Sequence, residues 1–283
     1  MVDPDEVHVD GAQTDLRVMH LTDCHVSVPG DEGGAYAAFS RRMHNAYTDY
    51  DRLGAFENLM TVAVDHAVDL IALTGDAVNY PGPEGINLLT RMLEDTGVPW
   101  VFTAGNHDWH YEGMPGSSRD LRERWRRELA SLYSGHDPHC AAVTINGLRF
   151  VLIDNSTYQI DERQLAFYET QTADGNPTVL LVHIPLSVEA LRVARPGEPL
   201  CGDPCWGADT DGNWEIERRD RWSASGNDVC TEAFLSRVTA TRNLLGILCG
   251  HIHQARIDPV NDRANQYVTA PGFTGGCRLI QFS

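Results

Sequence analysis

Metal-ligand side chains follow five hydrophobic, strand-like segments of this 283-residue sequence, at the point where each segment ends. They are aspartates, histidines and one asparagine: Asp23 and His25, Asp76, Asn106, His183, and His251 and His253. In open α/β sheets, functional groups gather beyond the carboxyl ends of the strands. These five strand ends therefore predict one convergent metal site.

The spacing within two ligand pairs predicts how they share an ion. Asp23 and His25 are two residues apart, as are His251 and His253. In an extended segment, side chains i and i+2 point the same way, so each pair could reach one ion while Cys24 faces into the packing. Carboxylate, imidazole and amide ligands favour Mn, Fe, Zn or Ni over Mg and Ca, and copper(I) and iron–sulfur chemistry are not expected without thiolates. A tight turn at the strand end is predicted by three glycines that each precede a ligand: Gly75, Gly105 and Gly250.

Ten short segments, many of them rich in Val, Ile and Leu, have the pattern of strands: 16–22, 69–74, 98–103, 141–145, 148–153, 178–183, 244–250, 255–258, 265–269 and 277–282. Apolar residues at helical spacing predict helices at 51–67, 84–95, 118–133 and 229–242. Strands and helices alternate up to about residue 104, which favours parallel strands joined by crossovers. Asn146-Gly147 instead predicts a two-residue hairpin, so we expect mixed sheets. Two segments lack regular patterning: 27–49 and 194–228.

The sequence is strongly acidic, with a formal net charge of −18, and all 22 basic residues are arginines. Broad binding to nucleic-acid backbones or anionic membranes needs a basic face, so neither long nucleic acids nor membranes are expected as partners. A small phosphorylated substrate remains compatible, because a bound divalent metal reverses the local field. No apolar run approaches the roughly 18 residues that span a bilayer, and residues 1–15 lack the apolar core of a secretory signal. We therefore expect a cytoplasmic protein.

Seven cysteines, an odd number with mostly wide gaps, do not form the disulfide framework of a small secreted domain. Cys201 and Cys205 are the only close pair and could form a loop disulfide. A structural zinc site there is disfavoured, because no second Cys/His pair has the usual tight spacing. A metal or redox element that also uses Cys230 is a further alternative, which thiol titration with and without a chelator would test.

The calcineurin-like metallophosphoesterases carry an ordered set of motifs that this sequence resembles over residues 18–253: Asp23-Cys24-His25, Gly75-Asp76 with Asn79, Gly105-Asn106-His107-Asp108, His183, and Gly250-His251-Ile252-His253. Each motif alone is weak, but the ordered set, with each member at a predicted strand end, is specific. The resemblance implies an α/β fold of the α+β type, with two mixed sheets sandwiched by helices in four αββα layers. Residues 1–283 would form one domain, in which an insertion at about 194–228 caps the substrate.

The resemblance also implies a dinuclear centre and a role for each residue. Two sets of three residues would each bind one metal ion: Asp23, His25 and His253 for one ion, and Asn106, His183 and His251 for the other. Asp76 would bridge the two ions. His107 would lie beside the metals without binding them, and Asp108 would orient it, so these two are the expected catalytic residues.

The implied reaction is hydrolysis of a phosphate ester with two divalent transition-metal ions, identified only as Mn, Fe, Zn or Ni. The ions would lower the pKa of a shared water, and the resulting metal-bridging hydroxide would attack phosphorus. Protonated His107 could donate to the leaving group. We expect a phosphodiesterase acting on small or nucleotide-like substrates, and a phosphomonoesterase with the same mechanism is the alternative.

A second alternative, from another class, is a non-catalytic scaffold of the same fold that binds protein. Such a scaffold would be expected to lose ligands, and here all of them are present.

One departure within the family is informative. The iron(III)-tyrosinate phosphatases place a tyrosine three residues after the bridging aspartate, where this sequence has Asn79 followed by Tyr80. A purple, Fe(III)-dependent enzyme is therefore not expected.

Overall fold

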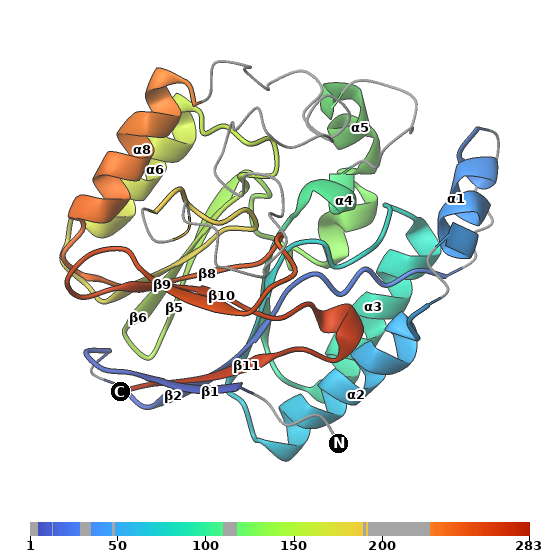
Figure 1. Cartoon of the computed structure of the whole chain (residues 1–283), viewed down its shortest axis with the longest axis horizontal. Helices are drawn as coiled ribbons and strands as arrows, with labels where there is room; N and C mark the ends of the chain where they lie inside the picture. The colour runs from blue at the N-terminus through green and yellow to red at the C-terminus, as the bar shows by residue number, and fades with distance from the viewer. Residues whose placement is uncertain are drawn as a thin grey trace.

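The computed structural model describes residues 5–12, 14–28, 35–46, 49–109, 118–188, 191 and 227–283. Its strands are β1 (Asp5–Val9), β2 (Leu16–Leu21), β3 (Leu70–Thr74), β4 (Trp100–Thr103), β5 (Cys140–Ile145), β6 (Leu148–Ile153), β7 (Thr178–Leu181), β8 (Leu244–Cys249), β9 (Arg256–Pro259), β10 (Asn265–Val268) and β11 (Arg278–Phe282). Its helices are α1 (Ala35–Ala46), α2 (Arg52–Asp65), α3 (Pro83–Thr96), α4 (Asn106–Trp109), α5 (Ser118–Trp125), α6 (Glu162–Thr172) and α8 (Val229–Ala240), with short 3-10 helices η1 (Glu128–Ser131) and η3 (Gly272–Thr274) (Figure 1).

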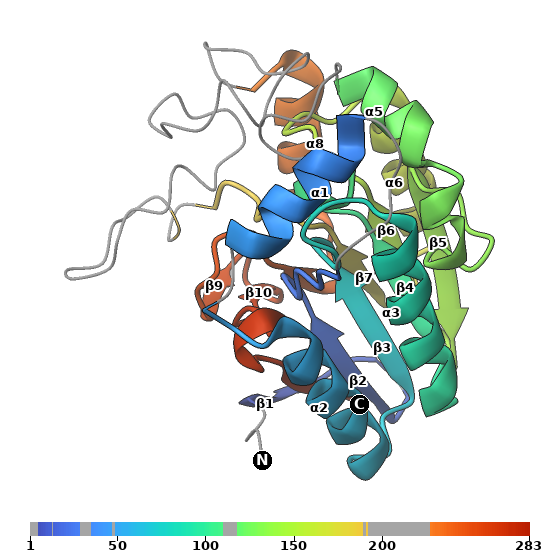
Figure 2. The ribbon, with the colours of Figure 1, turned by 90° about the vertical axis from the view of Figure 1, so that its right-hand side faces the viewer.

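Two mixed sheets run β1-β11-β2-β3-β4 and β5-β6-β7-β8-β10-β9. In the first sheet β2, β3 and β4 are parallel, and in the second sheet β6, β7, β8 and β10 are parallel. Figure 2 shows β2 and β3 running side by side toward the same end of the molecule. Because parallel neighbours point their carboxyl ends the same way, each sheet presents several strand ends, and the loops that follow them, at one edge.

Helices cover the outer faces of both sheets. Buried side chains of β2, β3 and β4 pack with those of α2 and α3, and buried side chains of β6, β7 and β8 pack with those of α6 and α8. A third cluster, which includes Val18 and Phe150, lies between the sheets and draws on both. Each fully buried aliphatic or aromatic side chain contributes roughly 1.5–3 kcal/mol to this packing. The arrangement is the predicted four-layer αββα sandwich, with the two helix pairs on opposite sides in Figure 1.

All ten strands predicted from the sequence are present, with small differences at their ends. The predicted hairpin joins β5 to β6, and both of its turn residues have positive φ, 48° at Asn146 and 89° at Gly147. The predicted helix at 118–133 is divided into α5 and η1, although its apolar stripe is buried as expected.

Several elements escaped prediction, among them β1, α6 and α1. The strand β1 pairs in parallel with β11, but its polar, mostly exposed residues hide the strand pattern. The helix α6 is only weakly amphipathic and is marked instead by a capping box between Asp161 and Gln164. The prediction that 27–49 lacks regular structure is wrong for 35–46, which form α1. Within the described ranges, no helix has both the length and the apolar character needed to cross a membrane.

Candidate metal centre

Donor atoms from five strand ends meet in one cluster. Among the described residues, carboxylate and imidazole atoms form three groups in which all ligand atoms lie within 4.8 Å of one another: Asp23, His25 and His253; His25, Asp76 and His107; and Asp76, His183 and His251. His25 and Asp76 each belong to two groups, so the three groups are continuous. The structure thus brings six of the seven candidate ligands together with His107.

The backbone at the ligand pairs differs from the sequence-based expectation. The prediction of an extended segment at Asp23 and His25 is wrong, because their φ angles are 50° and 45°, in the left-handed region. His251 and His253 have the same conformation, with φ angles of 69° and 53°. A non-glycine residue in this region costs on the order of 1–3 kcal/mol, and such residues cluster at functional sites. The fold therefore maintains a strained backbone at both ligand pairs, while Cys24 is buried as expected.

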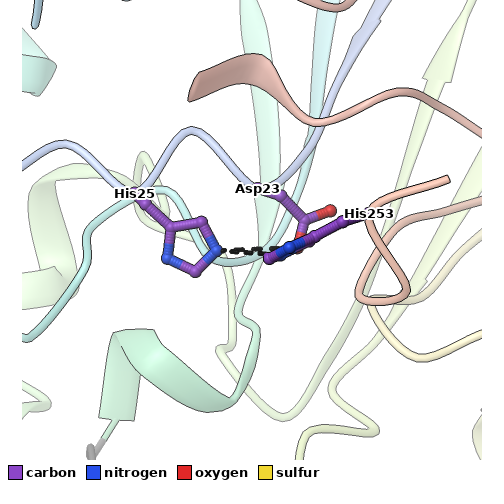
Figure 3. Close-up of side chains that lie close together, drawn as sticks. All are labelled: Asp23, His25 and His253. Carbon is purple, nitrogen blue, oxygen red and sulfur yellow. Dashed lines mark hydrogen bonds and ion pairs between the residues drawn. The ribbon is translucent and has the colours of Figure 1, made fainter. Parts of the chain in front are cut away.

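The first group joins the end of β2 to the loop after β8. His253 Nε2 lies 3.2 Å from Asp23 Oδ1 and 3.2 Å from His25 Nε2, and Figure 3 shows the two rings meeting beside the carboxylate. The other oxygen, Asp23 Oδ2, accepts hydrogen bonds from His251 N at 2.9 Å and Thr22 Oγ1 at 2.8 Å. Burial favours the neutral acid, but the positive charge of His253 outweighs it and lowers the pKa of Asp23. The carboxylate is therefore ionised and held in place.

The third group centres on Asp76. His183 Nδ1 lies 2.8 Å from Thr74 O, and because a carbonyl oxygen only accepts, Nδ1 carries the hydrogen. His183 Nε2 lies 3.2 Å from Asp76 Oδ2 and has no hydrogen-bond partner among the described residues. Burial opposes the charged form, but the Asp76 carboxylate outweighs it and raises the pKa of His183 to about 10. The site thus favours a positive charge between these two side chains, as a metal ion would supply.

Asn106 supplies an independent indication of a cation. Its side chain is 2% exposed, and its Oδ1 has no hydrogen-bond partner among the described residues. A buried amide oxygen without a donor costs roughly 1–3 kcal/mol, unless a water or an ion contacts it. The neighbouring His107 N donates to Asp76 Oδ1 at 2.9 Å, which keeps this turn against the cluster. Amide, carboxylate and imidazole donors together fit a divalent transition metal.

Neighbouring atoms leave no room for a Cβ at any of the three glycines that precede ligands. Gly75 has the positive φ of a tight turn, 88°, as predicted. Gly105 and Gly250 do not have positive φ; instead, a Cβ at either position would overlap a ligand carboxylate, that of Asp76 or Asp23 respectively. The absence of a side chain is therefore what lets these loops pack directly on the aspartates.

His107 belongs to the second group, with His25 and Asp76. Its ring contacts that of His25 edge-on, with centroids 4.6 Å apart, and its Nδ1 lies 3.1 Å from Asn79 O. These contacts orient the ring in the cluster. Asn79 occupies the position of the tyrosine in the iron(III)-tyrosinate enzymes. Its backbone oxygen contacts the ring of His107.

Asp108 is fully buried, and its two carboxylate oxygens accept hydrogen bonds from the backbone, at 2.8 Å from Gly105 N and 3.1 Å from Val78 N. It therefore closes the turn that carries Asn106 and His107. The sequence-based hypothesis that Asp108 orients His107 stays a prediction, and any such effect would pass through the backbone of the turn.

A sixth strand end, overlooked in the sequence, supports the site. Asn155 follows β6 and is fully buried. Its Oδ1 accepts hydrogen bonds from His183 N and Ile184 N, both at 3.0 Å, and its Nδ2 donates to Ile184 O at 2.7 Å. The available signal was the polar run Asp154-Asn155-Ser156 directly after a predicted strand. Asn155 thus holds the backbone of His183 in place.

Two expectations fall outside the described residues. The proposed cap at 194–228 lies outside them except for its last two residues, and so do Cys201 and Cys205. Cys230 is described and lies at the start of α8.

Two curated proteins are similar to parts of this sequence. DNA double-strand break repair protein Mre11 of Haloferax volcanii is 28% identical over 172 residues, which are 59% of this chain and 34% of that protein. A probable cyclic nucleotide phosphodiesterase of Psychrobacter arcticus is 32% identical over 97 residues, which are 33% of this chain and 31% of that protein. The chain thus spans about a third of the length of these curated relatives.

Solved structures share the fold. A dimetal phosphatase from Danio rerio has a TM-score of 0.52 at 12% identity, covering 91% of this chain and 88% of its own. A purple acid phosphatase from yellow lupin seeds has a TM-score of 0.54 at 13% identity, covering 93% of this chain and 44% of its own. The calcineurin-like phosphoesterase family model matches residues 16–255, a range that contains every candidate ligand. The chain therefore belongs to the calcineurin-like phosphoesterase family.

Proposed function

We propose that this chain is a phosphodiesterase that hydrolyses small or nucleotide-like esters with two divalent transition-metal ions, drawn from Mn, Fe, Zn and Ni. Two sets of residues would hold the ions: Asp23, His25 and His253 for one, and Asn106, His183 and His251 for the other. The observation that carries the proposal is the position of Asp76 between the sets. Its Oδ2 lies 3.7 Å from His25 Nε2 and 3.2 Å from His183 Nε2, so one carboxylate can serve both ions.

When bound, the two ions would polarise the phosphoryl oxygens and lower the pKa of a nearby water. The side chains of the protein keep the site ready for this chemistry. Asp76 remains ionised despite its burial, because His183 and His107 lower the pKa of its carboxyl group. His107, protonated, would donate a proton to the leaving-group oxygen from its place beside His25. Asp108 and Asn155 would hold the backbone that carries the reacting groups.

The substrate class rests on two observations. One relative is named as a probable cyclic nucleotide phosphodiesterase, which supports a small nucleotide-like diester. The other relative is a DNA repair protein, but the net charge of −18 disfavours long nucleic acids, because a protein that binds phosphate backbones needs a basic face. The small diester is therefore the substrate that we favour.

The test is a substrate panel assayed after reconstitution of the metal-free protein with Mn, Ni, Zn or Fe. We expect turnover of bis(4-nitrophenyl) phosphate and of cyclic nucleotides to exceed that of 4-nitrophenyl phosphate. Loss of a residue that only orients a metal ligand costs roughly 10- to 100-fold in activity. Because Asp76 would itself bind the ions, Asp76→Asn should lower kcat by more than this. Asp10→Asn, at an exposed position, is the matched control.

Each result of this panel has a definite meaning. Full activity of Asp76→Asn would contradict the proposed centre. A preference for 4-nitrophenyl phosphate would instead establish a phosphomonoesterase of the same mechanism. If no ester is turned over with any of the four metals, the non-catalytic, protein-binding alternative replaces the proposal.

A further inference from the structure

A chain of aromatic rings leads from the metal-ligand cluster to the surface. The ring of Phe273 lies 5.7 Å from that of His25 and 5.1 Å from that of His253, measured between centroids. On its other side, Phe273 contacts Tyr50 at 5.0 Å. All three contacts are edge-to-face, in the distance range at which aromatic pairs attract one another. Phe273 therefore joins two candidate ligands to Tyr50.

The outer end of this chain is accessible. Tyr50 is 53% exposed, and in the described part of the chain it is the only aromatic residue among the exposed large hydrophobic side chains. The side chain of His253 is 42% exposed, so the cluster itself is open on this side. Phe273 lies between the two and is half-buried. An apolar aromatic surface thus adjoins the open side of the candidate metal centre.

The backbone of Phe273 is hydrogen-bonded to the ligand-bearing loop. Phe273 N donates to Asp23 O at 3.1 Å, and Gly272 N donates to Thr22 O at 2.8 Å. A Cβ at Gly272 would come within 2.7 Å of Cys24 Sγ, so this approach requires glycine. In Figure 1, η3, which carries Phe273, lies against α2. The ring is thus positioned before any ligand arrives, which reduces the entropy lost on binding.

We propose that Tyr50 and Phe273 form a stacking platform for an aromatic ring attached to the phosphate of the substrate, either an aryl group or a nucleobase. The inference rests on the proposed function, because it places the phosphate at the neighbouring metal centre. A ring joined to phosphorus by few bonds can then lie on the platform while the phosphate contacts the ligand cluster. Stacking of a base on an aromatic side chain contributes roughly 1–3 kcal/mol, so a preference of about 5- to 150-fold is expected.

The test is equilibrium binding to the metal-loaded protein by titration calorimetry, with two matched pairs of ligands. Phenylphosphonate and methylphosphonate differ in an aryl ring, and adenosine 5′-monophosphate and ribose 5-phosphate differ in a nucleobase. Wild-type protein should bind the aromatic member of at least one pair about 5- to 150-fold more tightly. Which pair shows the preference distinguishes an aryl ester from a nucleotide.

Three variants separate stacking from packing. Tyr50→Ala should bring the ratio of the two dissociation constants to about one, whereas Tyr50→Phe should retain it, because stacking needs only the ring. Phe273→Leu keeps an apolar side chain beside His25 but removes the ring, and it should also lower the ratio. The proposal is overturned if the wild-type protein shows no preference, or if Tyr50→Ala retains it.

Turnover of bis(4-nitrophenyl) phosphate by the wild-type protein separates this inference from the proposed function. Turnover without an aromatic preference would overturn the platform and leave the function standing. An aromatic preference that Tyr50→Ala removes, in a protein without turnover, would support the platform as a ligand site and remove the proposed function.

Discussion

The Nε2 atoms of His25 and His253 lie 3.2 Å apart, although the two residues are separated by 228 positions in the sequence. Two imidazole nitrogens at this distance must share a proton or a cation, since two bare lone pairs would repel each other. Burial and the neighbouring His107 hold the pKa of His25 well below its ordinary value. The Asp23 carboxylate instead outweighs burial and raises the pKa of His253. A metal ion between the two rings would satisfy both nitrogens.

The first prediction concerns metal binding and stability. Mn²⁺ should raise the melting temperature of the chelator-treated protein, because a ligand that binds only the folded state stabilises it. At a free concentration 100 times the Kd, the gain is about 2.7 kcal/mol. Asp23→Asn should lose most of this rise, because the amide removes the negative charge beside His253, whereas Asp10→Asn should keep it. Thermal unfolding with and without the metal provides the measurement, and an equal rise in both variants would count against the site.

The second prediction concerns Asn155 as a positioning residue. Asn155→Ala leaves His183 N and Ile184 N without their acceptor and frees the loop that carries a candidate ligand. We expect metal affinity to fall by roughly 10- to 100-fold, as for other partners that orient ligands. Elemental analysis after dialysis should show the metal content falling from two ions toward one. Asn176→Ala, at an exposed asparagine, should retain both ions. Full metal content in Asn155→Ala would contradict this role.

The third prediction concerns the dependence of stability on pH. His20 is buried between the sheets, where its ring nitrogens lie 2.7 Å from Thr74 Oγ1 and from Thr269 Oγ1. Burial, assisted by the positive charge of Arg278, lowers the pKa of His20 to about 3, against 6.5 ordinarily. Between these values the unfolded chain binds one more proton than the folded one. The contribution of His20 to stability is therefore complete above pH 6.5 and falls by about 1.4 kcal/mol per pH unit down to pH 3.

Urea unfolding of the metal-free protein at several pH values measures this slope. His20→Gln can retain hydrogen bonds to the threonines but does not titrate, so its stability should fall less steeply below pH 6.5 than that of wild type. His8→Gln, at an exposed position, should retain the wild-type slope. Identical slopes for wild type and His20→Gln would show that His20 is not buried in its neutral form.

The fourth prediction compares two glycines. A Cβ at Gly250 would overlap Thr22 Oγ1 and the Asp23 carboxylate, so Gly250→Ala should cost about 1–3 kcal/mol and weaken metal binding. At Gly85, inside α3, a Cβ would lie 3.8 Å from Val28 Cγ2, an ordinary contact. Gly85→Ala should therefore stabilise the protein by about 0.5–1 kcal/mol, because alanine loses less backbone entropy than glycine. Chemical denaturation gives both values, and a neutral Gly250→Ala would be inconsistent with the close approach described here.

Much of the fold could be predicted from local patterns. Short apolar runs identified the strands, and Asn146-Gly147 identified the hairpin, because both signals are contained within a few residues. β1 was missed for the opposite reason. The exposed polar residues of β1 form a strand only because β11 supplies a partner from the other end of the chain.

The sequence by itself determined which residue types follow the strands, and therefore the kind of chemistry the chain can perform. Only the tertiary structure decided the backbone conformation of these residues and the contacts that hold them in place. The left-handed backbone at Asp23 and His251, and the position of the His183 backbone against Asn155, depend on contacts between segments far apart in the chain. Sequence spacing carries no record of such contacts, because strained local conformations persist only where distant packing and hydrogen bonds outweigh their cost.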